Sequence, residues 1–273
     1  MTHSLDGTLA LVPAGPHRWT GACGRAYWNM VGPFGGTTAA TLLQAVLVHP
    51  DLLGAPTALT VNYAAALTDA PFTIEARPVR TNRSTQHWML TMLQADADGQ
   101  EQVVTTATAV TAVRRATWGG TDMPMPSVPP PAGLPPVGAL PGIAWSQRYE
   151  LRPVAGVLPA AWDGAEGPDS LSRVWMRDAP PRPLDFCALA ALCDMFYPRV
   201  WRRRALRVPA GTVSMTVYFH ADAELLAATG DGFLLGQAQG QEFRNGFFDQ
   251  SAQVWNEAGR LLATSHQIVY YKE

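Results

Sequence analysis

Residues 186–197, FCALAALCDMFY, form an apolar run with a single charged side chain, the carboxylate of Asp194. The run predicts a buried helix, and Pro198 closes it. Burying an unpaired carboxylate costs roughly several kcal/mol. A negative charge in the last turn of a helix also opposes the helix dipole. A carboxylate kept under both penalties is a candidate acid, base or water-orienting group.

The predicted helix starts a pattern that occurs twice. In each copy a helix is followed by one strand and then by three more. The first copy comprises a helix over 36–48 and strands over 58–63, 72–79, 87–95 and 102–113. The second comprises the helix of Asp194 and strands over 211–220, 233–239, 247–255 and 260–271. The offset between matching residues rises from 150 to 160 along the chain, as expected for two copies with small loop insertions.

A proline- and glycine-rich segment separates the copies. Residues 117–142 are too rich in these residues for a helix or a central strand and predict an extended linker. Residues 1–116 then form one repeat and residues 143–273 the other. A sheet that packs one face on an apolar helix still has open edges, so we expect the repeats to pair side by side. A single α+β domain without internal symmetry is the alternative.

The composition excludes several partners. The 273 residues are 47% hydrophobic and 15% charged, with a net charge of -2, so no global field attracts nucleic acid or an anionic membrane. No apolar stretch reaches the roughly 18 residues of a membrane span, and residues 1–7 lack the features of a secretory signal. The cysteines Cys23, Cys187 and Cys193 are odd in number and lack metal-ligand spacing. We expect a cytoplasmic protein without a metal.

Polar residues on the second copy's strands are candidate site residues. Alternation along 211–220 predicts that Thr212 and Ser214 share one face. Gln267 is a polar residue in a mostly small or apolar row of the last strand. A stripe of small residues leads along the helix to Asp194 and predicts space for a ligand; its members are Cys187, Ala190 and Ala191.

The order and spacing of several motifs resemble the TesB-like acyl-CoA thioesterases, the thioesterase II family. The similarity covers almost the whole chain outside the linker. In the first half the motifs are Phe34-Gly35-Gly36 and Arg83-Ser84-Thr85. In the second half they are VWMR at 174–177, LCDMF at 192–196, YFH at 218–220 and GRLLATSHQ at 259–267.

The resemblance implies an α+β double hotdog fold, in which two curled antiparallel sheets each wrap a central helix. It implies a catalytic Asp, Thr or Ser, and Gln, which match Asp194, Thr212 and Gln267, with Ser214 as a substitute for the threonine. Gln44 and Thr57 stand near the corresponding places of the first copy, which has no acid there and is expected to be catalytically silent. The substrate would be an acyl-CoA, with no bound cofactor, and the protein a homodimer or higher homo-oligomer.

The implied chemistry is hydrolysis of a thioester by a bound water. Asp194 would accept the water's proton, a step typically worth about 10²–10⁴-fold in rate. Backbone N–H groups at a helix start, beside Gly35 and Gly36, are candidate oxyanion donors. Arginines that could contact the coenzyme A phosphates are Arg80, Arg83 and Arg202, although a solvated loop explains the basic run at 201–204 equally well.

Other interpretations remain open from the sequence. Asp194 could be a structural residue paired with one of the arginines at 199 and 202–204. Cys193 could be a nucleophile, although packing explains it better. The chain could be a non-catalytic acyl-CoA-binding protein or an acyl-thioester hydratase or dehydratase, but no histidine is suitably placed beside Asp194. Residues 64–66 are three alanines where the family often has bulkier and basic residues, which leaves the substrate preference open.

Overall fold

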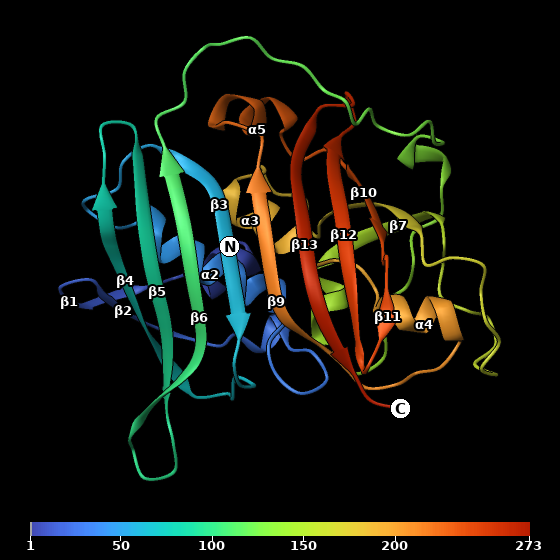
Figure 1. Ribbon diagram of the computed structural model, residues 1–273, viewed down its shortest axis with the longest axis horizontal. Helices are drawn as coiled ribbons and strands as arrows, with labels where there is room; N and C mark the ends of the chain where they lie inside the picture. Colours follow the sequence, from blue (N-terminus) through green and yellow to red (C-terminus); the bar gives the residue numbers. More distant parts are fainter. Residues whose placement is uncertain (1) are drawn as a thin grey trace.

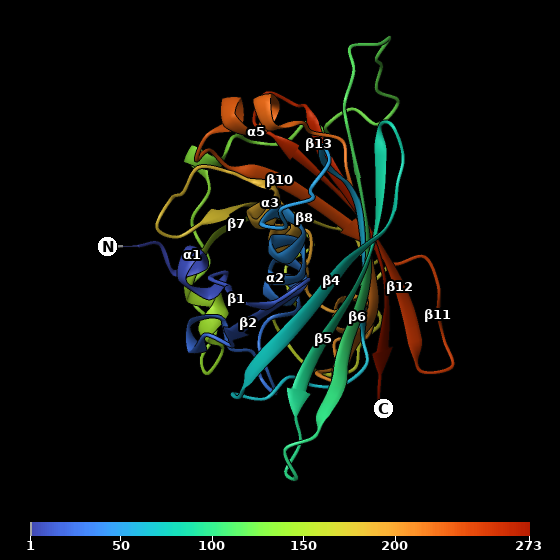
Figure 2. The same cartoon turned by 90° about the vertical axis from the view of Figure 1, so that its left-hand side faces the viewer.

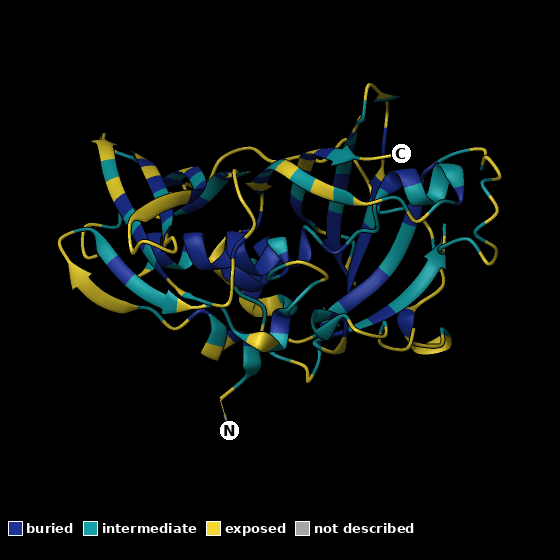
Figure 3. Cartoon of the chain, turned by 90° about the horizontal axis from the view of Figure 1, so that it is seen from below, coloured by how far each residue is buried: buried dark blue, intermediate teal, exposed yellow. Residues whose placement is uncertain are grey.

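One continuous antiparallel sheet curls around two buried helices in the computed structural model (Figure 1). The helices are α2 (Gly35–Leu47) and α3 (Phe186–Leu192). The view turned by 90° shows how the sheet curls around them (Figure 2). Both helices are buried, whereas exposed residues alternate along the outer strands (Figure 3). The structure describes residues 2–273; Met1, which begins the N-terminal segment considered above, lies outside them.

The thirteen strands follow a symmetric order. Twelve of them lie in the order β1-β2-β4-β5-β6-β3-β9-β13-β12-β10-β8-β7, and β11 pairs with β12. The first six are β1 (Val12–Gly15), β2 (Arg18–Ala22), β3 (Ala55–Tyr63), β4 (Pro71–Thr81), β5 (Thr85–Ala95) and β6 (Glu101–Ala112). The others are β7 (Tyr149–Ala155), β8 (Ser172–Asp178), β9 (Ala210–Phe219), β10 (Leu234–Gln239), β11 (Phe243–Arg244), β12 (Phe247–Asn256) and β13 (Leu261–Tyr271). The order of the second half mirrors that of the first, so the predicted repeat is confirmed.

Short elements complete each half. They are α1 (Ser4–Thr8), α4 (Arg199–Arg204), α5 (Ala223–Thr229), and the 3-10 turns η1 (Arg25–Tyr27), η2 (Pro131–Gly133) and η3 (Ala144–Gln147). The two strands that precede each central helix were not predicted. Of these, β1, β2 and β7 contain the glycine or proline that normally marks a loop, whereas β8 contains neither. The helix predicted over 186–197 was also too long. It ends at Leu192, and Asp194 lies in the following turn.

The two halves join through β3 and β9. These strands pair antiparallel, and the hydroxyls of Thr60 and Thr216 lie 2.9 Å apart across the junction. The side-by-side pairing expected from the open sheet edges is therefore confirmed. Each half therefore covers one open edge of the other half's sheet. In the described strand order, the two open edges are at β1 and β7.

The two central helices pack unusually closely. A Cβ atom on Gly36 would lie 2.5 Å from the carbonyl oxygen of Ala191, so only glycine fits there. Farther along, the Cys187 thiol donates to Oε1 of Gln44 at 3.4 Å. The stripe of small residues on α3 therefore faces α2, and the prediction that it leaves space for a ligand is wrong.

The linker lies on the outer face of the second half's sheet and covers an apolar row there. The row consists of Trp175, Leu235 and Trp255 on three neighbouring strands. The two indole N–H groups donate to linker carbonyl oxygens, Trp175 to Pro129 at 2.9 Å and Trp255 to Met123 at 3.2 Å. The proline-rich segment is thus extended, as predicted, but it also buries a second, smaller core.

In the part of the chain that the structure describes, no helix has both the length and the apolar character needed to cross a bilayer.

A buried carboxyl group at the end of β8 lacks a partner. Asp178 is only 4% exposed, and its Oδ1 forms no hydrogen bond within residues 2–273. The hydroxyls of Tyr27 and Tyr149 are buried without partners as well. Burial raises the pKa of Asp178 to about 7, with Arg182 opposing the shift. Folding therefore favours the protonated acid.

This raised pKa predicts a pH-dependent stability. The unfolded carboxyl ionises near pH 4, so its contribution to stability is complete below pH 4 and is lost as the pH rises to about 7. Asp178→Asn removes that loss. In urea unfolding series from pH 4 to 9, the variant should gain stability relative to the wild type up to pH 7 and keep a constant advantage above it.

Asp122→Asn, on the exposed linker, is the control and should follow the wild type. The contribution of Asp194 cancels in this comparison because every variant retains it. A difference between Asp178→Asn and the wild type that does not change with pH would contradict the prediction.

Candidate active site

The three side chains predicted to form the site meet in one hydrogen-bonded chain. Nε2 of Gln267 donates to Oδ1 of Asp194 at 2.8 Å, and the Thr212 hydroxyl donates to Oε1 of Gln267 at 3.1 Å. Asp194 comes from the turn after α3, Thr212 from the start of β9, and Gln267 from β13. The amide uses its donor and its acceptor side at once, so its orientation fixes both neighbours.

A β-bulge turns Thr212 towards this chain. In the pairing of β9 with β13, Ser214 is opposite Ile268 and Thr212 is opposite Val269, so Val213 is an extra residue. The bulge reverses the alternation. Thr212 faces the interior, whereas the Ser214 hydroxyl donates to Oδ1 of Asn62 at 2.9 Å on an exposed part of the sheet. The prediction that Thr212 and Ser214 share a face is therefore wrong, and Ser214 cannot replace Thr212 in the chain.

The carboxylate of Asp194 lies against the start of α2, a helix of the other half. The backbone N–H of Gly36 donates to it, and a Cβ atom on Gly35 would lie 2.8 Å from Oδ2. The positive N-terminal end of the α2 dipole favours the carboxylate, and this offsets the negative C-terminal end of α3, which Asp194 follows. Burial still dominates and raises the pKa of Asp194 to about 7, against the hydrogen bonds from Gln267 and Gly36.

Of the two glycines predicted to supply a backbone donor, only Gly35 has a free N–H. Gly36 is used by Asp194, while no hydrogen bond from the Gly35 N–H is found within residues 2–273. Tyr63 was not predicted to belong to the site. Its hydroxyl donates to the carbonyl oxygen of Gly35 at 2.9 Å. Burial and the nearby Asp194 raise the pKa of Tyr63, so this hydroxyl stays protonated and holds the helix start in place.

A cavity of about 760 Å³ opens beside these groups. Among residues 2–273, Asp194 is the only charged side chain in its lining, which is otherwise mostly apolar. Its lining includes the exposed residues Met30 and Val31 and the buried residues Phe248 and Gln250. The pattern of one carboxylate and a few amides in an apolar cavity is typical of a small-molecule site.

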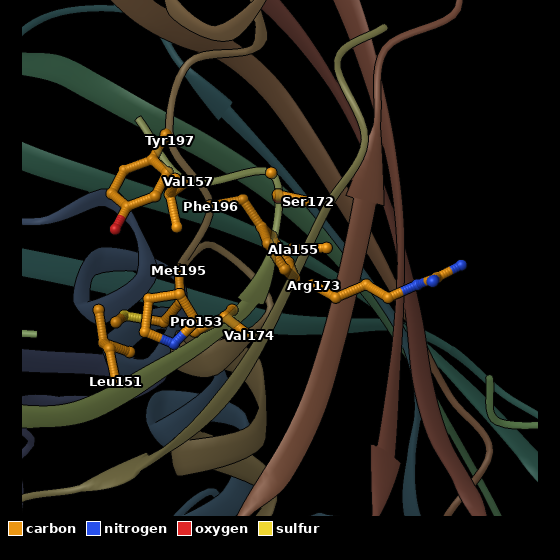
Figure 4. Close-up of a pocket in the computed structure, with 11 residues that line it drawn as sticks. Leu151, Pro153, Ala155, Val157, Ser172, Arg173, Val174, Met195, Phe196 and Tyr197 are labelled. Atoms are coloured by element: carbon orange, nitrogen blue, oxygen red, sulfur yellow. The ribbon is translucent and has the colours of Figure 1, made fainter. Parts of the chain in front are cut away.

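The segment after Asp194 is held against the second half's sheet. Met195 and Phe196 share a small pocket with side chains of β7 and β8, and Arg173 points away from it (Figure 4). The buried guanidinium of Arg199 donates to the carbonyl oxygen of Tyr197 at 2.8 Å and to Oγ of Ser172 at 2.7 Å. These contacts fix the wall of the cavity next to the carboxylate.

The arginines offered as structural partners of Asp194 are engaged elsewhere. Arg199 donates to backbone carbonyls, Arg202 lies 4.0 Å from Asp169, Arg203 donates to a backbone carbonyl, and Arg204 pairs with Glu273 at 2.8 Å. Within residues 2–273 no ion pair involves Asp194. The structural salt bridge is therefore not formed.

The other candidate groups are not placed for chemistry. Cys193 is buried, its thiol pKa is raised by burial, and its carbonyl accepts from Oγ of Ser265. Among the described residues, no histidine lines the cavity, and no group of three His, Cys, Asp or Glu could hold a metal. His220 lies just after the end of β9 and His266 lies on β13, both at exposed positions.

The arginines proposed to bind the coenzyme A phosphates do not line the cavity. Arg80 and Arg83 lie at the turn between β4 and β5. The strand pairing puts this turn near the Ala55 end of β3, whereas the cavity is at the Tyr63 end. Arg202 lies next to the cavity residue Trp201 but points to Asp169.

The first half lacks an equivalent chain. A matching bulge in β3 makes Thr57 the extra residue between Pro56 and Ala58, so Thr57 corresponds to Val213. Pro56, which has no hydroxyl, is then the counterpart of Thr212, and Thr57 lies one residue away from the corresponding place. The Thr57 hydroxyl donates to the Val110 carbonyl at 2.9 Å.

Comparison with known proteins supports the fold and gives the family. The chain is 50% identical to a conserved hotdog-fold protein of unknown function from Alicyclobacillus acidocaldarius, with a TM-score of 0.92 over 100% of this chain and 99% of that one. A candidate thioesterase II from Thermobifida fusca is 19% identical, with a TM-score of 0.83 over 99% and 98% of the chains. The acyl-CoA thioesterase II TesB2 from Mycobacterium marinum is 17% identical, with a TM-score of 0.75 over 98% of each chain.

No curated protein matches the sequence. Two family models do match it: the acyl-CoA thioesterase N-terminal domain over residues 25–112 and the acyl-CoA thioesterase C-terminal domain over residues 124–271. Together with the hotdog architecture of both halves, these matches show that the chain belongs to the acyl-CoA thioesterase family.

Proposed function

We propose that the protein hydrolyses an acyl-CoA thioester to a free acid and coenzyme A. The hydrogen-bonded chain of Asp194, Gln267 and Thr212 at the wall of a large apolar cavity is the observation that supports this function most directly. The three groups come from separate elements of one half, and Asp194 also accepts from the backbone N–H of Gly36. Their remaining lone pairs would hold one water.

The attacking water would bind between Asp194 and Thr212. Oδ1 of Asp194 accepts from Gln267, and the carboxylate also accepts from the Gly36 N–H, so a remaining lone pair of Oδ2 would accept one proton of the water. The Thr212 hydroxyl gives its own proton to Gln267, so its oxygen can accept the water's second hydrogen bond. A lone pair of the water then points into the cavity, where the thioester carbonyl would lie. This fixed orientation provides the positioning that hydrolysis requires.

Proton transfer and charge stabilisation complete the reaction. As the water oxygen bonds to the carbonyl carbon, its proton moves to Asp194 and the carbonyl oxygen becomes an oxyanion. The free N–H of Gly35, at the positive end of α2, is the proposed donor to this oxyanion. When the C–S bond breaks, the proton on Asp194 passes to the departing sulfur. No covalent enzyme intermediate is needed.

Asp194→Asn should abolish turnover without unfolding the protein. The amide has nearly the shape of the carboxylate but cannot accept a proton, so kcat should fall by about 10²–10⁴-fold. The measurement is thiol release from acyl-CoA substrates of several chain lengths, with thermal unfolding as the control for folding. Binding of acyl-CoA without turnover by the wild type would instead support the non-catalytic interpretation.

The rate should depend on the ionisation of Asp194. Because its pKa is raised to about 7, the base is mostly protonated at pH 6 and mostly ionised at pH 8. We expect kcat/KM to rise about tenfold per pH unit below 7 and to level off above it. Stopped assays from pH 5 to 9 test this expectation. A profile that is flat across neutral pH would remove Asp194 from the role of base.

Thr212 and Ser214 offer a matched pair of hydroxyl deletions on the same strand. Thr212→Val keeps the shape of the side chain but removes the acceptor for the water, so kcat should fall at least about tenfold, the value of one hydrogen bond of roughly 1.4 kcal/mol. Ser214→Ala loses only its contact with Asn62 and should keep the wild-type rate. A larger loss of activity in Ser214→Ala than in Thr212→Val would contradict the bulged geometry.

A further inference from the structure

A second amide lies beside Gln267 on the inner face of the sheet. Gln250 of β12 is directly opposite Gln267 in the pairing of β12 with β13. Side chains of directly paired residues have Cβ atoms about 4.5–5.5 Å apart. Gln250 also lines the cavity, as do Phe248 and part of the segment that follows Asp194. It is therefore one strand farther from the helix α2 than the proposed catalytic chain.

Gln250 is buried but has no protein partner. The residue is 3% exposed, yet within residues 2–273 its side chain forms no hydrogen bond. The amide of Gln267, by contrast, is fully used by Asp194 and Thr212. No atom of Gln250 is among the fully buried polar atoms that lack a partner in residues 2–273, so its amide faces the open space of the cavity and is free to bond a ligand there.

The position of Gln250 distinguishes the acyl group from the coenzyme. The phosphates of coenzyme A must stay in water, so we expect the coenzyme to lie near the exposed lining residues Met30 and Val31. Gln250 and Phe248, 3% and 1% exposed, line the same cavity, and we expect the acyl chain to lie against these buried residues. A hydroxyl or keto oxygen on the third carbon of an acyl chain is separated from the thioester carbonyl by about the spacing of neighbouring strands.

We propose that Gln250 is a specificity residue that hydrogen-bonds an oxygen on the acyl chain, so that the preferred substrates are acyl-CoA thioesters with a hydroxyl or keto group near the thioester. This inference rests on the proposed thioesterase function. A plain alkyl chain would displace water from Gln250 and leave the amide unpaired. Sites built to bond a polar group discriminate strongly against analogues that lack it, because the buried partner is then unsatisfied.

The test compares binding and turnover of two matched ligands. Binding is measured by calorimetry with non-hydrolysable thioether analogues of 3-hydroxyacyl-CoA and of the unsubstituted acyl-CoA of equal length. Turnover is measured with the corresponding thioesters. The variants are Gln250→Leu and, as the matched control, Gln253→Leu on the same strand, where Gln253 accepts a hydrogen bond from Gln237 on the outer face.

The wild type should bind the hydroxylated analogue at least about tenfold more tightly than the plain one, the equivalent of 1.4 kcal/mol. Gln250→Leu should remove this preference by weakening only the hydroxylated ligand, and Gln253→Leu should retain it. Thermal unfolding checks that both variants are folded. A merely structural role of Gln250 would change the binding of both ligands alike.

Three results would overturn the proposal. The first is equal binding of both analogues by the wild type, and the second is a preference that survives in Gln250→Leu. The third is an equal loss of binding for both ligands in Gln250→Leu, which would place the amide against the coenzyme. The thioesterase function is tested separately by the thioesters. If neither is hydrolysed while the thioether preference depends on Gln250, the proposed reaction fails and Gln250 stands as a ligand-binding residue.

Discussion

The close contact between the start of α2 and the end of α3 is the constraint on which the rest of the structure depends. Gly36 lies so near the Ala191 carbonyl that no side chain fits between the helices. This approach brings the carboxylate of one repeat to the backbone N–H groups of the other. The site is therefore composite: the acid, hydroxyl and amide belong to the second half, while the helix start and Tyr63 belong to the first.

The acid is held between opposing forces. Burial in an apolar cavity disfavours its charge, whereas the start of α2 and the Gln267 amide favour it. The balance leaves its pKa near neutrality, where a base is both available and strong enough to accept a proton. An ion pair with one of the arginines close in sequence would lower the pKa of Asp194. In the fold these arginines instead contact backbone carbonyls and other acids. The proposed role of Asp194 as a base thus depends on the absence of an arginine partner in the described part of the chain as well as on its bonds to Gln267 and Gly36.

The sequence was sufficient for the parts of the fold that follow from local periodicity. The repeat, the eight core strands and the position of Asp194 after a buried helix could be predicted, because the sequence shows apolar patterning interrupted by a single charge. The face of Thr212 could not, because one extra residue at Val213 reverses the alternation and a bulge leaves no clear local signal. The roles of Tyr63 and Gln250 depend on strand pairing between distant segments, and the packing of the small stripe depends on which helix faces it.

The two halves share one topology, but the linker covers the outer face of the sheet only in the second half. By covering the row of Trp175, Leu235 and Trp255, it closes the convex side of β8, β10 and β12. The convex side of the first half carries no such strap, and Met89 on β5 is 61% exposed there. Copies that stack sheet against sheet can therefore use the first half and the central strands, but a fully symmetric contact over both halves would require the strap to detach.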